Sequence, residues 1–254
     1  MGSLAFPLGT DFVDVGSGSQ LDGLNVATIC AWIKTPADLT TAKTIYSKND
    51  SKIFRTDAGG ALAIAVDRAT TGLSIVAGSA LSTSTWYFVA ASYKATGVDG
   101  DQKLFVGALG SPAAEVGSYT AQAVGTGSVT SDGAGNGRIG ARVAGTVPFV
   151  GQIAGVLIFK DINLSLNEIR RVQERPRNIA SSICALWMPG YIAGSSVPDF
   201  SGAVNTGTVN GAPTQSGGYP WRISGAPTYP VVQAAAAGSA TIPLFMNQYR
   251  QRWK

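Results

Sequence analysis

Residues 137–173 read GRIGARVAGTVPFVGQIAGVLIFKDINLSLNEIRRVQ, and this stretch decides the fold. Its apolar run, Phe149–Phe159, is rich in β-branched residues and is interrupted by Gly151 and Gly155. β-Branched side chains favour the pleated strand, whereas two glycines would weaken a helix. The run therefore predicts a long strand, with a shorter strand and a loop ahead of it.

A short helix is predicted directly after this strand. Ser165 and Glu168 stand three residues apart, just before Ile169 and Val172. In such a capping box the serine side chain accepts a bond from the glutamate N–H, and the glutamate side chain accepts one from the serine N–H. The pattern predicts a helix that begins at Ser165 and ends before Pro176, because the residue before a proline leaves the helical region.

Composition favours one large β domain. The chain has 254 residues, 32 of them glycine, and short strands joined by tight turns account for that content. Charged residues make up 13% of the chain, about half of the ~25% usual in soluble domains. Two explanations stay open: part of the outer surface is hidden against a partner, or a large sandwich exposes serine and threonine. No apolar run approaches the ~20 residues of a membrane span, so no membrane partner is expected.

The net charge of +4 lies in the C-terminal part of the chain. After Asp199 there are four basic residues and no acidic one, so the first 199 residues are neutral overall. A basic end of this kind suits an acidic protein surface or a polyanion. Nucleic acid is not expected, because its sites cluster basic residues among aromatic ones, and these charges are sparse.

Histidine is absent, and the two cysteines, Cys30 and Cys184, are far apart in the sequence. A zinc site is therefore not expected, and catalysis through a histidine base is excluded. Both cysteines lie in strand-like runs, so we expect buried thiols, with their disulfide state left open. The chain start lacks a basic region followed by an apolar core. We expect no secretory signal, and assembly in a reducing cytoplasm.

Short strands recur at a spacing of about ten residues, which is typical of a sandwich or barrel. In residues 25–34 the alternation puts Ile29 and Ile33 on one face and Cys30 and Trp32 on the other. Further strands are predicted at 44–48, 51–56, 61–67, 73–77, 85–93, 103–109 and 116–121, and residues 4–16 are predicted to form a strand pair that turns near Gly9.

Six segments in order resemble a known family: VDVG (13–16), ATICAWIK (27–34), TIYSK (44–48), STSTWYFVAASYKA (82–95), GRIGA (137–141) and PFVGQIAGVLIFKDINLSLNEI (148–169). Each is short, but together they are similar to the laminin-G-like, concanavalin A-like jelly-roll family. The resemblance implies an all-β fold, a two-sheet antiparallel jelly-roll sandwich with one short helix. It also implies a concave face and rim loops, which in this family often bind glycans or calcium.

Residues 182–214, SICALWMPGYIAGSSVPDFSGAVNTGTVNGAPT, resemble the stretch that usually opens this family. Here the stretch follows the helix instead of preceding the first strand. Because the ends of a sandwich lie close together, a C-terminal segment can supply a strand that an N-terminal one would supply. We expect residues 182–210 to pack back near residues 4–16, within a sandwich of residues 1–214. The alternative is a separate C-terminal appendage.

Residues 215–254 are predicted to form an extended arm, because their prolines forbid regular ladders. Phe88 and Leu157 lie where the resemblance implies polar residues on outer strand faces. An apolar outer face needs a cover, which the arm or a neighbouring subunit would supply. The arm also carries candidate partner contacts: Tyr219, Trp221, Tyr249, Arg250, Arg252 and Trp253.

Few residues in the sequence are candidates for metal binding or catalysis. Asp132 and Asn136, in the loop SDGAGNG, are candidate calcium ligands, as are Asp99 and Asp101, although ordinary turns use the same residue types. No other cofactor is expected. Glycosidases that share this sandwich carry a Glu-x-Asp-x-Glu strand, and the chain lacks it. We therefore expect no enzymatic activity and no catalytic residues.

Two hypotheses about function follow. The first is a non-enzymatic virion structural protein, since the chain resembles laminin-G-like proteins encoded among the particle genes of tailed bacteriophages. It would decorate the capsid or tail, anchored through its C-terminal arm to the major capsid or tail protein. Homo-oligomers are expected, because particle proteins form symmetric assemblies. The second hypothesis is an adhesin that binds surface glycans through the rim loops of the sandwich.

Overall fold

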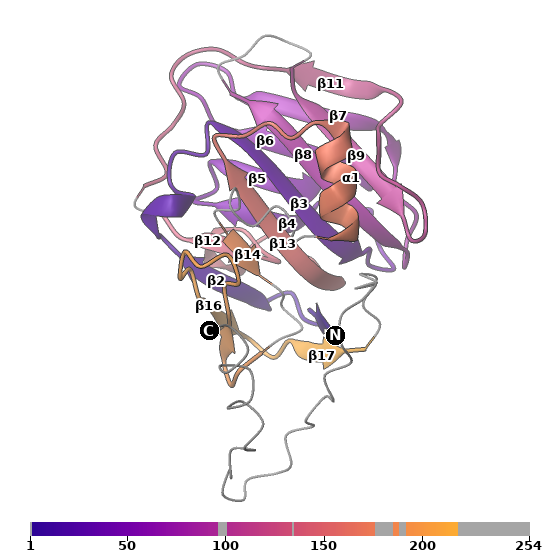
Figure 1. Ribbon diagram of the computed structural model, residues 1–254, viewed down its shortest axis with the longest axis vertical. Helices are drawn as coiled ribbons and strands as arrows, with labels where there is room; N and C mark the ends of the chain where they lie inside the picture. The colour runs from indigo at the N-terminus through magenta and orange to yellow at the C-terminus, as the bar shows by residue number, and fades with distance from the viewer. Residues whose placement is uncertain (1, 96–100, 134, 176–184, 188–191, 218–254) are drawn as a thin grey trace, which may run out of the picture. The chain divides into compact units, whose positions relative to one another are not determined.

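The computed structural model describes residues 2–95, 101–133, 135–175, 185–187 and 192–217. Within these ranges the chain forms two antiparallel sheets (Figure 1). The eight-stranded sheet has the order β10-β9-β8-β3-β13-β1-β17, and β14 pairs with β13 beside β1. Its strands are β1 (Ser3–Ala5), β3 (Val26–Lys34), β8 (Trp86–Lys94), β9 (Lys103–Ala108), β10 (Ala114–Glu115), β13 (Gln152–Lys160), β14 (Ala185–Trp187) and β17 (Thr214–Ser216).

The nine-stranded sheet has the order β11-β7-β6-β5-β4-β12-β2-β16-β15 among the described residues. Its strands are β2 (Phe12–Gly16), β4 (Lys43–Lys48), β5 (Lys52–Thr56), β6 (Ala61–Val66), β7 (Leu73–Ala80), β11 (Tyr119–Ala123), β12 (Gly137–Ile139), β15 (Ser196–Val197) and β16 (Gly207–Asn210). Two 3-10 turns, η1 (Ser19–Leu21) and η2 (Val143–Gly145), lie in connections between strands. The predicted two-sheet antiparallel sandwich is confirmed.

The main core lies between the two sheets. Ile29 and Ile33 of β3 share one cluster of buried side chains with Phe54 of β5 in the other sheet. Cys30 and Trp32, on the opposite face of β3, belong to a different cluster. The alternation predicted for this strand is confirmed. Burying each large apolar side chain stabilises the sandwich by about 1.5–3 kcal/mol.

The second cluster lies on the outer face of the eight-stranded sheet, beneath α1 (Leu166–Glu174). Figure 1 shows the helix lying across this sheet, over β8 and β9. Ile169 and Val172 of α1 are buried there with Phe88 of β8 and Leu157 of β13. The helix therefore covers apolar strand residues that would otherwise face water.

The start of α1 follows the predicted capping box. The Ser165 Oγ accepts a bond from the Glu168 N–H at 3.4 Å, and Glu168 Oε2 accepts one from the Ser165 N–H at 2.7 Å. The sequence prediction for this helix is confirmed.

The prediction that Phe88 and Leu157 dock a partner is wrong. Both side chains are fully buried, because α1 of the same chain covers them. The apolar pattern correctly indicated that this face needs a cover. The cover is the amphipathic helix that directly follows β13, so neither a second subunit nor the arm is required at these two residues.

C-terminal strands complete both sheets. β16 pairs with β2 in the register Thr208–Asp14, and β17 pairs with β1 in the register Gln215–Leu4. Residues 207–210 thus lie beside the first strands, whereas residues 182–184 and 188–191 of the segment predicted to pack back lie outside the described residues. The boundary at residue 214 needs correction, because β17 runs to Ser216 and so belongs to the sandwich. Pro213, directly before β17, breaks no ladder, because β17 is an edge strand that pairs only with β1 among the described residues.

The predicted strand pair within residues 4–16 is wrong. β1 and β2 lie in different sheets, and each pairs with strands that are distant in the sequence. The turn near Gly9 carries the chain from one sheet to the other instead of closing a hairpin. In the described part of the chain, no helix is long and apolar enough to cross a membrane.

Candidate functional site

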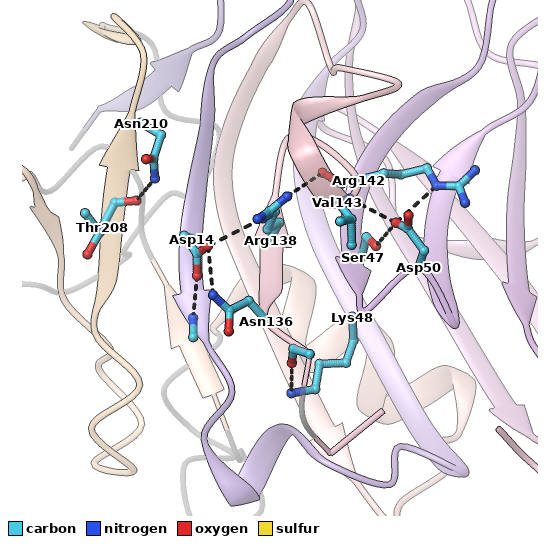
Figure 2. Close-up of polar contacts among 12 residues, drawn as sticks. Asp14, Ser47, Lys48, Asp50, Asn136, Arg138, Arg142, Val143, Thr208 and Asn210 are labelled. Atoms are coloured by element: carbon cyan, nitrogen blue, oxygen red, sulfur yellow. Dashed lines mark hydrogen bonds and ion pairs between the residues drawn. The ribbon is translucent and has the colours of Figure 1, made fainter. Parts of the chain in front are cut away.

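Polar side chains gather on the outer face of the nine-stranded sheet, over β2, β12 and β4 (Figure 2). In β2, Val13 and Val15 belong to the core, so Phe12 and Asp14 lie on the opposite face. The register sets Asp14 opposite Arg138 of β12. The same residue row continues to Ser47 of β4 on one side and Thr208 of β16 on the other.

Asp14 is the centre of the first polar group. Its Oδ2 accepts a bond from Asn136 Nδ2 at 3.0 Å and lies 3.4 Å from Arg138 Nε. Arg138 also donates from Nη1 to the Arg142 carbonyl at 3.1 Å. Its guanidinium carbon lies 4.9 Å from the centre of the Phe12 ring. These contacts fix the arginine in one orientation.

Asp50 organises a second polar group beside the first. The hairpin between β4 and β5 turns at Asn49 and Asp50, with φ of 48° and 53°, a left-handed conformation that asparagine and aspartate tolerate. Asp50 Oδ1 accepts bonds from Ser47 Oγ at 3.2 Å, Arg142 Nε at 3.2 Å and the Val143 N–H at 3.0 Å. The strands predicted at residues 44–48 and 51–56 pair through this turn, and the turn carries a site residue.

Both groups are held in place yet remain within reach of solvent. The side chains of Asp14 and Arg138 are 20% and 17% exposed, and those of Asp50 and Arg142 are 31% and 29% exposed. The surface thus offers carboxylate acceptors, guanidinium donors and an aromatic ring at fixed positions. Because these side chains are already ordered, binding a ligand would cost little of their conformational entropy.

An interior ion-pair network lies at one end of the same sheet. Lys48 and Lys52 are fully buried. Lys48 Nζ lies 2.9 Å from Asp22 Oδ1 and donates to the Gly135 carbonyl at 2.6 Å, a bond visible in Figure 2. Lys52 Nζ lies 3.0 Å from Asp132 Oδ2. These pairs hold the loops of residues 18–25 and 130–133 against the sheet.

The candidate calcium ligands are placed in separate contacts. Asp132 is paired with Lys52 and accepts a bond from the Gly23 N–H at 2.8 Å, whereas the Asn136 side chain donates to Asp14. The structure therefore does not bring the two together as one ligand set. Within the described ranges there is no group of three or more acidic or cysteine residues placed to hold a metal ion. Of the other two candidates, Asp99 lies outside these ranges and Asp101 lies within them.

The remaining predicted partner residues, Tyr219, Trp221, Tyr249, Arg250, Arg252 and Trp253, lie outside the described residues. The polar face itself was not predicted from sequence. The alternation in FVDVG could have placed Phe12 and Asp14 on one face. Their approach to Arg138 could not have been found, because it depends on pairing between strands 124 residues apart.

A sequence model described as the concanavalin A-like lectin/glucanases superfamily, of the laminin G type, matches residues 8–170. The chain belongs to this superfamily. The resemblance seen in the six sequence segments is thereby confirmed, and the fold is that of a lectin-like sandwich. A search of curated proteins gave no significant match.

Solved structures share the fold at low sequence identity. A Bacteroides ovatus protein for which carbohydrate binding is proposed has a TM-score of 0.55 and 17% identity over 85% of this chain. This chain spans only 58% of that protein's length. The native heptameric SAP-like pentraxin of Limulus polyphemus has a TM-score of 0.45 and 17% identity, covering 67% of this chain and 81% of the pentraxin. Tailspike protein 2 of the Escherichia coli O157:H7 bacteriophage CAB120 has a TM-score of 0.45 and 14% identity, covering 72% and 26%.

Proposed function

We propose that this chain is a non-catalytic, lectin-like module that binds glycans through the outer face of the nine-stranded sheet. The observation that carries the proposal is the pair of ordered polar groups, Asp14 with Arg138 and Asp50 with Arg142, beside Phe12 on the face of a lectin-like sandwich. The site differs from the rim loops expected from the sequence in that it is centred on β2 and β12, with the β4–β5 turn at Asn49 and Asp50 beside them.

The chemistry of this face suits sugar hydroxyls. Each hydroxyl both donates and accepts a hydrogen bond, so a binding surface needs fixed acceptors and fixed donors side by side. Asp14 and Asp50 supply charged acceptors, and Arg138 and Arg142 supply planar sets of donors. Bonds to charged groups are about twice as strong as neutral ones. Phe12 adds an apolar surface for the C–H groups of a sugar ring.

The contacts on this face favour glycan binding without catalytic turnover. A glycosidase needs one carboxyl group that gives up a proton and a second that attacks the sugar or activates water. On this face Asp14 and Asp50 are each engaged by an arginine. Both carboxylates therefore serve as acceptors in an ordered network.

The experiment is a glycan array probed with the intact chain, followed by calorimetry on the best oligosaccharide. Asp14→Asn removes the charge at the centre of the row and should weaken binding by about tenfold or more. The matched control is Glu115→Gln, which changes an exposed ion pair with Lys103 in the other sheet and should leave binding unchanged. A reducing-end assay on the bound sugar should show no release. Absence of binding to any glycan, or equal effects of the two variants, would contradict the proposal.

We further propose that the module belongs to a virion of a tailed bacteriophage, as a structural protein that decorates the capsid or tail. The support is the resemblance seen in the sequence and the basic, aromatic composition of residues 218–254. In this role the chain would be assembled in the host cytoplasm, would form homo-oligomers and would be held by other virion proteins. Deleting residues 218–254 should abolish co-sedimentation with particles and leave glycan binding intact. Retained co-sedimentation would contradict anchoring through this segment.

A further inference from the structure

Arg55 lies on the same outer face, further along β5. Phe54, the residue before it, belongs to the core, so Arg55 projects on the opposite side of the sheet. Its cross-strand neighbours are Thr44 of β4 and Ala63 of β6. The side chain is half-buried, and its β6 neighbour Ala63 is small and buried.

Arg55 is an arginine without a partner among the described residues. Its Nε is buried and has no hydrogen-bond partner, and no carboxylate pairs with its guanidinium there. The hydroxyl of Thr44, its fully buried neighbour, also has no hydrogen-bond partner in this part of the chain. The carboxylate of Asp57, two residues further on, accepts the Ala61 N–H instead.

Arg138 and Arg142 on the same face are each paired with an aspartate. Arg55 differs from them in having no carboxylate partner among the described residues. A half-buried guanidinium loses hydration without gaining a counter-charge, which is unfavourable unless a ligand supplies one. The planar guanidinium fork matches two oxygen atoms of a carboxylate or sulfate group.

We propose that Arg55 binds the acidic group of an anionic sugar residue, so that the ligand of this face is an acidic oligosaccharide. This inference rests on the proposed glycan binding and narrows its ligand class. β12, which carries Arg138, lies two strands from β5 in the sheet. Arg55 lies two residues further along β5 than the position level with Arg138, which puts the two Cα atoms about 12 Å apart. A short oligosaccharide, rather than a single sugar, would span both the polar row and Arg55.

The test uses the full chain and an array of matched oligosaccharide pairs. Each pair has an acidic member, with a uronic acid, a sialic acid or a sulfate ester, and its neutral counterpart. Arg55→Gln removes the charge, and Arg55→Lys keeps the charge without the fork. The matched control is Arg171→Gln on the exposed side of α1, away from this sheet. Inorganic sulfate is titrated alone, to separate a free-anion site from a glycan site, and thermal unfolding of each variant checks the fold.

The expected result is that the wild-type chain binds acidic members about tenfold or more tighter than neutral ones. Arg55→Gln should remove this preference while neutral binding and the unfolding midpoint stay unchanged, Arg55→Lys should keep part of it, and Arg171→Gln all of it. Equal binding of acidic and neutral members, or a preference that survives in Arg55→Gln, overturns the role of Arg55 but leaves the proposed glycan binding standing. Binding of sulfate but of no acidic glycan assigns the site to free anions and overturns the inference. Failure of every oligosaccharide to bind overturns glycan binding itself, and the inference with it.

Discussion

Lys48 and Lys52 are direct cross-strand partners in the hairpin of β4 and β5, and both side chains are fully buried. Two like charges in this position repel each other. Here each ammonium group has its own carboxylate, Asp22 for Lys48 and Asp132 for Lys52. The pairs join two loops to the end of the nine-stranded sheet.

Replacing Lys52 should destabilise the sandwich strongly. Lys52→Met leaves the Asp132 carboxylate buried without its partner, which should lower the free energy of unfolding by about 3–5 kcal/mol. Urea denaturation measures the change. Lys103→Met, which breaks an exposed pair, is the control and should cost less than about 1 kcal/mol. Similar losses in the two variants would show that the buried pair does not hold the loops.

The helix cap should make stability depend on pH. Hydrogen bonds from the Ser165 hydroxyl and N–H lower the pKa of Glu168 below its ordinary value. A lowered carboxyl pKa contributes stability at pH values above the unfolded pKa, and this contribution is lost as pH falls through the folded pKa. Unfolding measured from about pH 6 to about pH 3 spans this range.

Glu168→Gln is the matched variant for the helix cap, because it keeps the shape of the side chain and removes the titration. It should lose less stability than the wild-type chain on acidification. Identical pH profiles for the two proteins would show that the cap does not titrate as proposed.

Closure by the C-terminal strands should be visible in a pair of truncations. A chain that ends at residue 217 keeps β16 and β17 and should unfold cooperatively near the wild-type midpoint. A chain that ends at residue 205 loses both strands and exposes the edges of β1 and β2. It should unfold at a clearly lower temperature in calorimetry or remain partly unfolded. Equal midpoints would contradict a closing role for these strands.

The Cys30 thiol should be unreactive in the folded protein. The side chain is fully buried, and burial raises the pKa of this thiol, so little of the reactive thiolate forms. In a Cys184→Ser background, a thiol reagent should modify Cys30 only when denaturant unfolds the chain. Rapid labelling under native conditions would show that the face beneath α1 opens.

Local sequence patterns predicted those parts of the fold that depend on residues close together in the chain. The alternation in β3 and the capping box at Ser165 are of this kind, because the groups involved lie within a few residues of each other. The apolar character of Phe88 and Leu157 correctly indicated a covered face. It could not indicate which segment covers it, since that choice is made by tertiary packing.

The candidate site could not be predicted, because its residues meet through strand register. Asp14 and Arg138 are 124 positions apart, and a shift of one residue would turn either side chain into the core. The role of Arg55 could not be predicted either. It depends on the lack of a carboxylate or hydrogen-bond partner among the described residues, and a sequence does not show this.

The most direct test of glycan binding by this face is a crystal structure of the chain with the oligosaccharide that binds best. We predict that the sugar lies on the outer face of the nine-stranded sheet, in contact with Asp14 and Arg138. A sugar bound instead at the loops around Asp22 and Asp132, or on the side covered by α1, would contradict it.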